Sequence, residues 1–273
     1  MEKQQTIITP PAKLSFGFKE LWKYRELFYF FTWRDIKVKY KQTYLGIAWA
    51  VLQPLALMLL FTFVFAKNLH LDTGNVRYEV FVLSGLILWN LFYSSVSNAS
   101  DSMIQQANMI KKIYFPRLIV PSSSLLAALF DFIIAFIIFL LFCLIVQQPL
   151  QWNVIVFYPL GVVLLLLTAF GMGTFLSALT VKYRDFRYVV PFLLQFLFFG
   201  SQVIYSIHSI HQLWLKYILA LNPVNGAIEL FRIPFGTDYD MEVIGISIAS
   251  ALTITFAGLI YFRKAEAYFA DLV

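Results

Sequence analysis

Cysteine and charge are both scarce in this chain of 273 residues. Cys143 is the single cysteine, so no internal disulfide can form and no metal site can use several thiolates. Only 13% of the residues are charged, against about 25% in a typical soluble domain. The chain is instead 60% hydrophobic, with a mean hydropathy of +0.74. Because so little polar surface cannot coat a soluble body, the composition predicts a membrane protein.

A phosphate-binding loop for ATP is also missing. Such a loop ends in Gly-Lys, and none of the twelve glycines precedes a lysine. We therefore expect no ATPase site and no bound cofactor on this chain, so that any ATP and Mg²⁺ would be held by another subunit. A cleavable signal is not expected either, because the first long apolar run begins only near Leu45, behind a charged and aromatic segment.

Six apolar segments are long enough to cross a bilayer, which takes about 20 residues each. They are residues 45–66, 80–97, 118–146, 154–179, 188–207 and 243–262. The second is the least apolar, because its end turns polar at Ser94, Ser95, Ser97 and Asn98. The prediction is an all-α polytopic membrane protein with one transmembrane domain at 45–262, a cytoplasmic amino-terminal segment at 1–44 and a cytoplasmic tail at 263–273.

Lysine and arginine sort to one side of these six crossings. Nine precede residue 42, three follow the second crossing, three follow the fourth and two follow the sixth, whereas only Lys67, Arg77, Lys216 and Arg232 fall on the other side. Basic loops stay in the cytoplasm, so both termini are predicted inside. The net charge of +6 is then a topology and lipid-headgroup signal, not a sign of nucleic-acid binding.

An amphipathic helix is predicted over residues 16–40, where charge interrupts the apolar run too often for a crossing. Aromatic and apolar residues gather on one side, including Phe18, Leu21, Trp22, Phe28, Tyr29 and Trp33, although Arg25 interrupts this stripe. Lys19, Lys23, Glu26 and Arg34 gather on another side. We expect this helix to lie in the cytoplasmic interface of the membrane. The alternative is a soluble helix that packs on the loops.

Two short apolar pieces precede the last crossing, at residues 213–221 and 224–231. Neither is long enough to span, and Asn222-Pro223 separates them. They predict two re-entrant helices at the outer face, which must be covered by protein or line a water-filled path. We assign Asn222 and Pro223 to an outer gate; a plain extracytoplasmic loop is the alternative.

A few residues within or beside the crossings have functional interpretations. Asp131 is predicted to make a polar contact between helices or with a translocation path, because a proton relay would need further acidic groups in the membrane. The aromatic run Phe192, Phe196, Phe198 and Phe199 is a candidate channel lining, although lipid-facing aromatics are also common. Small residues at Gly171, Gly173, Ser177 and Ala178 favour close helix contacts, either within the chain or between two copies.

His208 and His211 form an H-x-x-H pair near Glu229 and Asp238, but zinc would need more ligands, so no metal is expected.

The chain resembles the permeases of type-2 ABC transporters that export polysaccharides, which include O-antigen, capsule and teichoic-acid exporters. The resemblance is carried by motifs spread over nearly the whole chain: WRDIKVKYKQTYLG at 33–46, AW at 48–49, QPL at 53–55, KKIYFPR at 111–117, KYRD at 182–185, NP at 222–223 and FRKAE at 262–266.

The resemblance implies a permease domain at 45–262 in the bacterial inner membrane, paired with a second copy of itself and bound to two ABC ATPase subunits. The substrate would be a lipid-linked polysaccharide, most directly an O-antigen. In this family the loop after the second crossing contacts the ATPase, which here assigns coupling to Lys111, Lys112, Tyr114, Pro116 and Arg117. The interface helix would include Trp22, Arg25, Trp33 and Arg34 and would contact membrane lipids.

Three other functions remain as alternatives. A type-2 ABC exporter of teichoic or capsular polymer, or one of drugs or small lipids, would have the same fold. A proton-coupled secondary transporter is disfavoured because Asp131 is the single acidic residue in the middle of a crossing.

Overall fold

The computed structural model describes residues 22–41, 43–66, 76–267 and 269, and this part of the chain contains helices and no strand. The α-helices have the following bounds: α2 Arg25–Tyr40, α3 Trp49–Phe61, α4 Tyr78–Gln105, α5 Ala107–Ile110, α6 Ile119–Ile145, α7 Val154–Lys182, α8 Phe186–Phe199, α9 Leu213–Ala220, α10 Pro223–Arg232 and α11 Met241–Glu266. The predicted all-α membrane fold is therefore confirmed. Of the predicted amino-terminal helix, residues 16–21 lie outside the described part.

Five segments are long and apolar enough to cross a membrane: Gly46–Phe65, Tyr78–Gln105, Ile119–Ile145, Val154–Lys182 and Met241–Glu266. They correspond to five of the six predicted crossings. Pro54 lies inside α3, and α3 ends in a π-helical turn at Thr62–Ala66.

The fifth predicted crossing, 188–207, is wrong as a continuous helix. Helix α8 has 14 residues, which is about 21 Å at about 1.5 Å per residue and short of a membrane core of about 30 Å. The chain leaves the helix because α10 supplies other partners for its backbone: the Asn225 side chain accepts from the Gln202 N–H at 2.7 Å and donates to the Gly200 carbonyl at 3.1 Å. A sixth crossing would therefore consist of α8 and the irregular segment that follows it.

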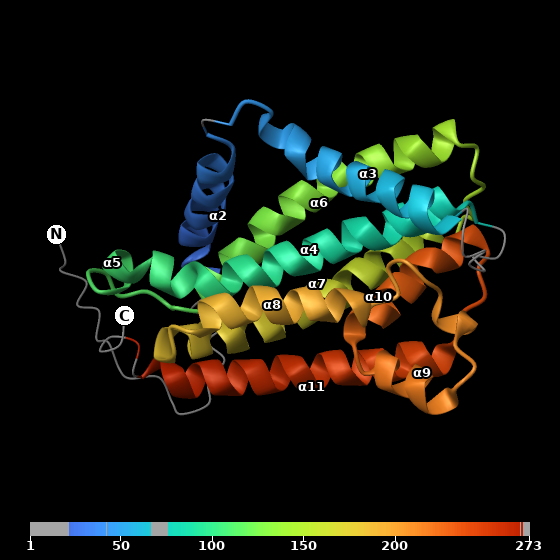
Figure 1. Ribbon diagram of the computed structural model, residues 1–273. Helices are drawn as coiled ribbons and strands as arrows, with labels where there is room; N and C mark the ends of the chain where they lie inside the picture. Colours follow the sequence, from blue (N-terminus) through green and yellow to red (C-terminus); the bar gives the residue numbers. More distant parts are fainter. Residues whose placement is uncertain (1–21, 42, 67–75, 268, 270–273) are drawn as a thin grey trace.

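Helix α4 lies at the centre of the bundle, with α6, α7, α3 and α8 around it (Figure 1). In the most hydrophobic stretch of 18 residues in α4, 78% of the residues are buried. The corresponding stretch of the Gly46–Phe65 segment has only 11% of its residues buried. The central position explains why the sequence of this crossing is the most polar of the set: its serines and asparagines meet other helices and a polar hollow instead of lipid. Helix α3 is peripheral and leaves most of its apolar surface uncovered.

Helices α7 and α11 pack side by side through small residues. A Cβ added at Gly258 would overlap the Gly171 carbonyl oxygen, and one added at Gly171 would overlap the backbone of Thr255. Gly173 similarly faces Ala99 of α4, where an added Cβ would lie 2.8 Å away. The small residues predicted along 171–178 therefore serve packing within this chain, which decides between the two interpretations left open by the sequence.

The two short helices before the last crossing are present, and they differ in their surroundings. All ten residues of α10 are buried, against α7, α11 and α4. Helix α9 is covered on one side only, and Trp214 and Leu213 are about two-thirds exposed. Figure 1 shows both at the end of the bundle opposite α5. We call the end that contains α5 and the basic loops the inner end, and the end with α9 and α10 the outer end.

Candidate functional site

A polar hollow of about 660 Å³ opens between α2, α3, α4 and α6 in the inner half of the bundle. We call it the inner hollow. Helix α4 contributes a stripe of amides and hydroxyls to it, at Asn90, Ser94, Ser97, Asn98 and Gln105. Apart from the adjacent Ser97 and Asn98, successive members of this set lie three, four or seven positions apart, so they share one face of the helix. The polar end of the second predicted crossing is thus the wall of a hollow.

Asp131 of α6 also lines the inner hollow, and its carboxylate accepts hydrogen bonds from Lys39 Nζ and the Tyr40 hydroxyl at the end of α2. This contact joins two helices that lie 91 residues apart in the chain. An interhelical contact is one of the two roles expected for Asp131 from its place in a crossing. The side chain also borders the inner hollow, while its contact with a translocation path stays a prediction.

Helix α2 presents a different face to the bundle than the sequence pattern predicted. Phe31 is fully buried against Phe115, with ring centroids 5.7 Å apart. Trp22 and Tyr29 of the predicted apolar stripe are 72% and 70% exposed, and Tyr29 stacks on Trp33. One face thus packs on the loop before α6 while the large aromatic rings project outward. The location of this helix in the membrane interface stays a prediction.

Two of the remaining predicted residues of this helix are cationic and contact aromatic rings. The Arg34 guanidinium lies 4.9 Å from the Phe31 ring centroid and donates to Asp35 at 2.6 Å and to Gln106 at 2.5 Å. Arg25 lies 6.0 Å from the Trp22 ring. Arg34 therefore connects α2 to the inner end of α4, whereas Arg25 contacts a ring just before α2.

The loop predicted to couple to an ATPase divides into exposed and buried residues. Lys111, Lys112 and Tyr114 are exposed after the short helix α5. Pro116 is buried, and Arg117 donates to the Glu266 carbonyl at the end of α11 and lies 5.9 Å from the Phe269 ring. The first three residues are free to meet a partner, and the last two hold the loop against the bundle.

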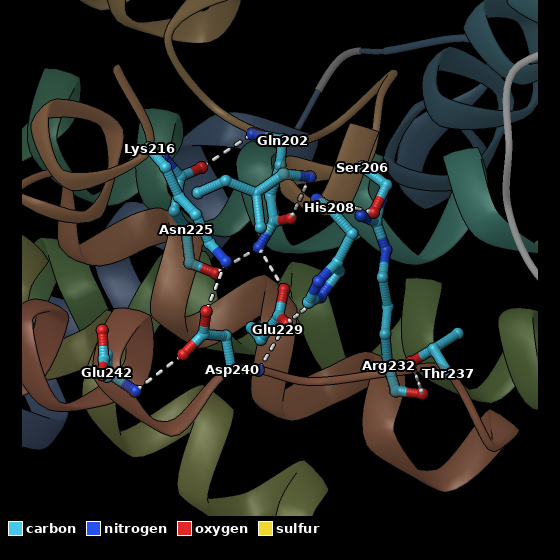
Figure 2. Close-up of polar contacts among 11 residues, drawn as sticks. Gln202, Ser206, His208, Lys216, Asn225, Glu229, Arg232, Thr237, Asp240 and Glu242 are labelled. Atoms are coloured by element: carbon cyan, nitrogen blue, oxygen red, sulfur yellow. Dashed lines mark hydrogen bonds and ion pairs between the residues drawn. The ribbon is translucent and has the colours of Figure 1, made fainter. Parts of the chain in front are cut away.

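At the outer end a buried polar network surrounds Glu229, whose side chain is 4% exposed (Figure 2). Its carboxylate accepts from the Gln202 amide at 2.9 Å and from the Asp240 backbone N–H at 3.3 Å. His208 Nε2 lies 2.7 Å from Glu229 Oε1, the oxygen that also accepts from Asp240. The Gln202 amide also donates to the Asn225 carbonyl at 2.7 Å. This network joins α10 to the irregular segment after α8 and to the start of α11.

Two ionisable groups of the network have shifted pKa values. The hydrogen bond to Glu229 raises the pKa of His208 above its usual range, against an opposing effect of burial. A hydrogen bond from Lys216 lowers the pKa of Asp240. Because each shift favours the charged form, the Lys216–Asp240 pair stabilises the outer end near neutral pH, and the His208–Glu229 pair does so at pH values below the raised pKa of His208. His208 is thus a partner of Glu229 and not an unpaired surface histidine; His211 is exposed.

Arg232, the last residue of α10, is 3% exposed and reaches into the bundle. Its Nη2 donates to the carbonyls of Phe81 at 3.0 Å and Val203 at 3.1 Å, and its guanidinium lies 3.4 Å from the Phe81 ring centroid. The ring and two carbonyls replace part of the water lost on burial, since both carbonyls accept from Nη2, whereas Nε and Nη1 have no hydrogen-bond partner among the described residues. Arg232 therefore connects α10, α4 and the segment after α8.

Sequence reasoning missed the outer network, because it counted Arg232 as a loop charge and considered Glu229 only as a possible zinc ligand. The available signal was spacing: Asn225, Glu229 and Arg232 lie four and three residues apart, which places them on one face of a short helix. Three polar residues on one face of an otherwise apolar helix indicate a polar partner.

The predicted gate residues Asn222 and Pro223 form the corner between α9 and α10. The Asn222 side chain accepts from the Val224 N–H at 3.2 Å and donates to the Ser201 hydroxyl at 2.9 Å. Pro223 is the first residue of α10, where its missing N–H costs nothing. Asn222 is thus the residue that fixes the corner, and Pro223 starts the next helix instead of interrupting one.

The predicted channel aromatics lie on the exposed face of α8. Phe192 and Phe196 are 66% and 76% exposed, and Phe199 lies on the same side. Phe198 faces inward, 5.3 Å from the Trp89 ring and 6.1 Å from the Phe61 ring of α3. The exposed rings of α8 and the exposed apolar residues of α3 are not covered by any other described part of the chain.

The chain is similar to known transport proteins over most of its length. The family model described as ABC-2 type transporter matches residues 26–235. The O-antigen export system permease protein RfbA of Klebsiella pneumoniae is 30% identical over 244 residues, which is 88% of this chain and 92% of that protein. The protein of the same name from Myxococcus xanthus is 26% identical over 258 residues, 93% and 98% of the two chains. The polysialic acid transport protein KpsM of Escherichia coli is 29% identical over 239 residues, 85% and 91%.

Proposed function

The chain belongs to the ABC-2 type transporter family, and we propose that it is the membrane subunit of an exporter that moves a lipid-linked polysaccharide across the bacterial inner membrane. The favoured substrate is the O-antigen of lipopolysaccharide. The observation that carries the proposal is the similarity to O-antigen export permeases over 88–93% of the chain. This similarity covers the helices that form the inner hollow and the outer network alike.

The transport energy comes from a separate ABC ATPase, since no Gly-Lys phosphate loop occurs in the sequence. Two ATPase subunits act on two copies of this chain. Lys111, Lys112 and Tyr114 are the exposed residues of the loop between α4 and α6, so they provide the contact. Movement of this loop is passed to the bundle through α4, which is continuous from the inner to the outer end.

The polymer path runs between two copies of the chain. Helix α3 and the exposed face of α8 offer a large uncovered apolar surface with many aromatic rings, among them Phe192 and Phe196. A second copy would cover part of it, and aromatic faces would line the remainder. Aromatic surfaces suit a sliding polymer, because they contact sugar rings without tight polar anchoring. At the outer end, α9, α10 and the Glu229 network close the path at rest.

The orientation follows from the charges. The basic residues assigned to the cytoplasm meet at one end of the bundle, as in the pairs of Arg187 with Asp101 and Arg34 with Gln106. We therefore place both termini in the cytoplasm of a bacterial cell, with α9 and α10 on the far side of the inner membrane.

A capsular polymer is the second candidate substrate, because KpsM, named for polysialic acid transport, is 29% identical to this chain. The two candidates share the fold and the mechanism and differ in the sugar.

The function is tested by deleting the gene and measuring surface polysaccharide by gel electrophoresis and capsule staining. We expect long-chain lipopolysaccharide to disappear from the surface and lipid-linked polymer to accumulate in the cytoplasm, with rescue by the wild-type gene. Loss of capsule with normal lipopolysaccharide would favour the second candidate. Normal levels of both polymers would contradict the proposal.

A further inference from the structure

The inner hollow has a lining without net charge. Its charged residues are Arg34, Asp35, Lys39 and Asp131, and each cation is bonded to a carboxylate within the same wall. Arg34 is bonded to Asp35 at 2.6 Å, and Lys39 to Asp131. No cation of the lining is therefore left over for a phosphate, whose recognition uses unpaired arginine or lysine.

The rest of the polar lining consists of amides and hydroxyls, mainly on α4. Asn and Gln side chains each offer two N–H donors and an acceptor, and a serine hydroxyl both donates and accepts. A ligand that matches this lining carries many groups that also donate and accept, which is the property of sugar hydroxyls. The apolar part of the lining, with Ile87, Leu91 and Phe132, suits the C–H faces of a sugar ring.

The position of the hollow is equally informative. It lies in a single subunit, within the inner half of the bundle, and is bordered by α2 and α3. Both bordering helices expose aromatic residues, Trp33 at 45% and Trp49 at 56%. A lipid chain can lie against these exposed rings in the membrane while its head group reaches the hollow.

We propose that the inner hollow binds neutral sugar residues at the lipid-proximal end of the polymer before they enter the export path. This inference rests on the proposed function and assigns it a loading site that lies apart from the path between two subunits. The hollow has a volume within the range of about 300–1,000 Å³ that is usual for small-ligand sites. If acyl chains filled the hollow, the polar side chains of α4 would lose their hydrogen bonds to water and gain none in return, which is unfavourable.

The test uses farnesyl diphosphate bearing one N-acetylglucosamine as probe, with farnesyl diphosphate and phosphatidylglycerol as comparison lipids. Binding to the purified complex of the permease and its ATPase is measured by native mass spectrometry. We expect the sugar to add about tenfold in affinity, the gain from one or two net hydrogen bonds. The double variant Ser94→Leu, Asn98→Leu should abolish this preference for the sugar-bearing lipid.

Both substitutions are chosen to preserve the fold, because Asn98 is exposed and Ser94 is half-buried. Thr253→Leu, a polar-to-leucine change at an exposed site on α11 outside the hollow, is the matched control and should keep the preference. Co-purification of the ATPase with each variant checks assembly. A cysteine at Ser97 should also react several-fold more slowly with a small methanethiosulfonate when the sugar-bearing probe is present, whereas a cysteine at Thr253 should not.

Three results would overturn the inference: a wild type that does not distinguish the sugar-bearing lipid, a leucine variant that still does, or phosphatidylglycerol that competes equally and protects the cysteine at position 97. Each leaves the proposed function untouched if the wild-type gene still restores surface polysaccharide. Failure of that rescue, with normal assembly of the complex, would count against the proposed function itself.

Discussion

The side chain of His208 links two separate segments at the outer end of the molecule. It comes from the short helical turn Ile207–Ser209, yet its partner Glu229 lies on the buried helix α10. The groups that act on the pKa of His208 include Glu229 and Asp238, which raise it, and Lys216, which lowers it. The charges around His208 are thus brought together by four separate segments: Ile207–Ser209, α9, α10 and the loop before α11.

A pH dependence of stability follows from the raised pKa of His208. Its folded-state pKa lies above the unfolded value of about 6.5, so the pair with Glu229 contributes fully below pH 6.5 and is lost as pH rises through the folded pKa. We expect the melting temperature of the purified permease to fall more steeply with rising pH above 6.5 than that of His208→Gln. The matched control His211→Gln, at an exposed site, should keep the wild-type slope. Equal slopes in wild type and His208→Gln would show that the pair does not stabilise the fold.

Close packing at single glycines gives a second prediction at this scale. A Cβ at Gly258 would overlap the Gly171 carbonyl, whereas one at Gly245, on the same helix, meets nothing within 4 Å. We expect Gly258→Ala to destabilise the protein by about 1–3 kcal/mol, the usual cost of overpacking. Gly245→Ala should leave stability unchanged or slightly raised. Thermal unfolding in detergent measures both, and similar melting temperatures for the two variants would contradict the packing described here.

At the scale of helices, the loop between α4 and α6 contains both its partner-facing and its structural residues. We expect the double charge reversal Lys111→Glu, Lys112→Glu to lower the partner's ATPase stimulation and polymer export severalfold, because both lysines are exposed where the partner would bind. Permease abundance should stay normal. The control Lys264→Glu reverses an exposed charge near the inner end of α11. If the double variant exports normally, the contact lies elsewhere, and residues 182–187 are the next candidate.

The corner between α9 and α10 gives the second prediction at this scale. Asn222→Ala removes the cap of α10 and the bond to Ser201, at a cost of about 1 kcal/mol for the cap. We expect a leak of small solutes through the resting complex, or a fall in export, at normal abundance. Pro223→Ala should have the weaker effect, because Asn222 still caps the helix. The control is Asn153→Ala, an asparagine at the start of α7 that caps nothing. Absence of leak and normal export in Asn222→Ala would make this corner a passive loop.

Helix positions were more predictable than helix partners. Hydropathy located α3, α6, α7 and α11 because each is a long apolar run, and it located α9 and α10 because Asn222-Pro223 separates them. It failed at the end of α8, where Asn225 and Gln202 supply the hydrogen bonds that end the helix. Asn225 lies more than twenty residues away in the chain from the end of α8, so no local pattern reveals it as a partner.

The same limit applies to helix faces and to the sites. In α2 the widest aromatic stripe is exposed and Phe31 is buried, because the partner Phe115 sits on a loop whose position the sequence does not contain. Asp131 was recognisable as a polar contact, since a lone carboxylate in a crossing must have a partner. Its partners Lys39 and Tyr40 could not be recognised from the sequence. The contact of Arg232 with Phe81 could not be recognised either.

The whole molecule has a polar hollow near one end and a buried ion-pair network at the other, with α4 running between them. Helix α4 lines the hollow with Ser94 and Asn98 and meets Arg232 through the Phe81 carbonyl. Helix α4 therefore contacts both sites. The uncovered apolar faces of α3 and α8 are the surfaces where the proposed second copy and the proposed path would lie.

The central claim is that this chain forms an ATP-driven polysaccharide exporter together with a separate ATPase. The most direct test reconstitutes the permease and its ATPase in proteoliposomes and measures the appearance of lipid-linked polysaccharide on the far side with an impermeant lectin or glycosidase. We predict transport that requires ATP and both proteins, with no ATP hydrolysis by the permease alone. ATP hydrolysis by the purified permease, or polymer movement without the ATPase, would contradict the account.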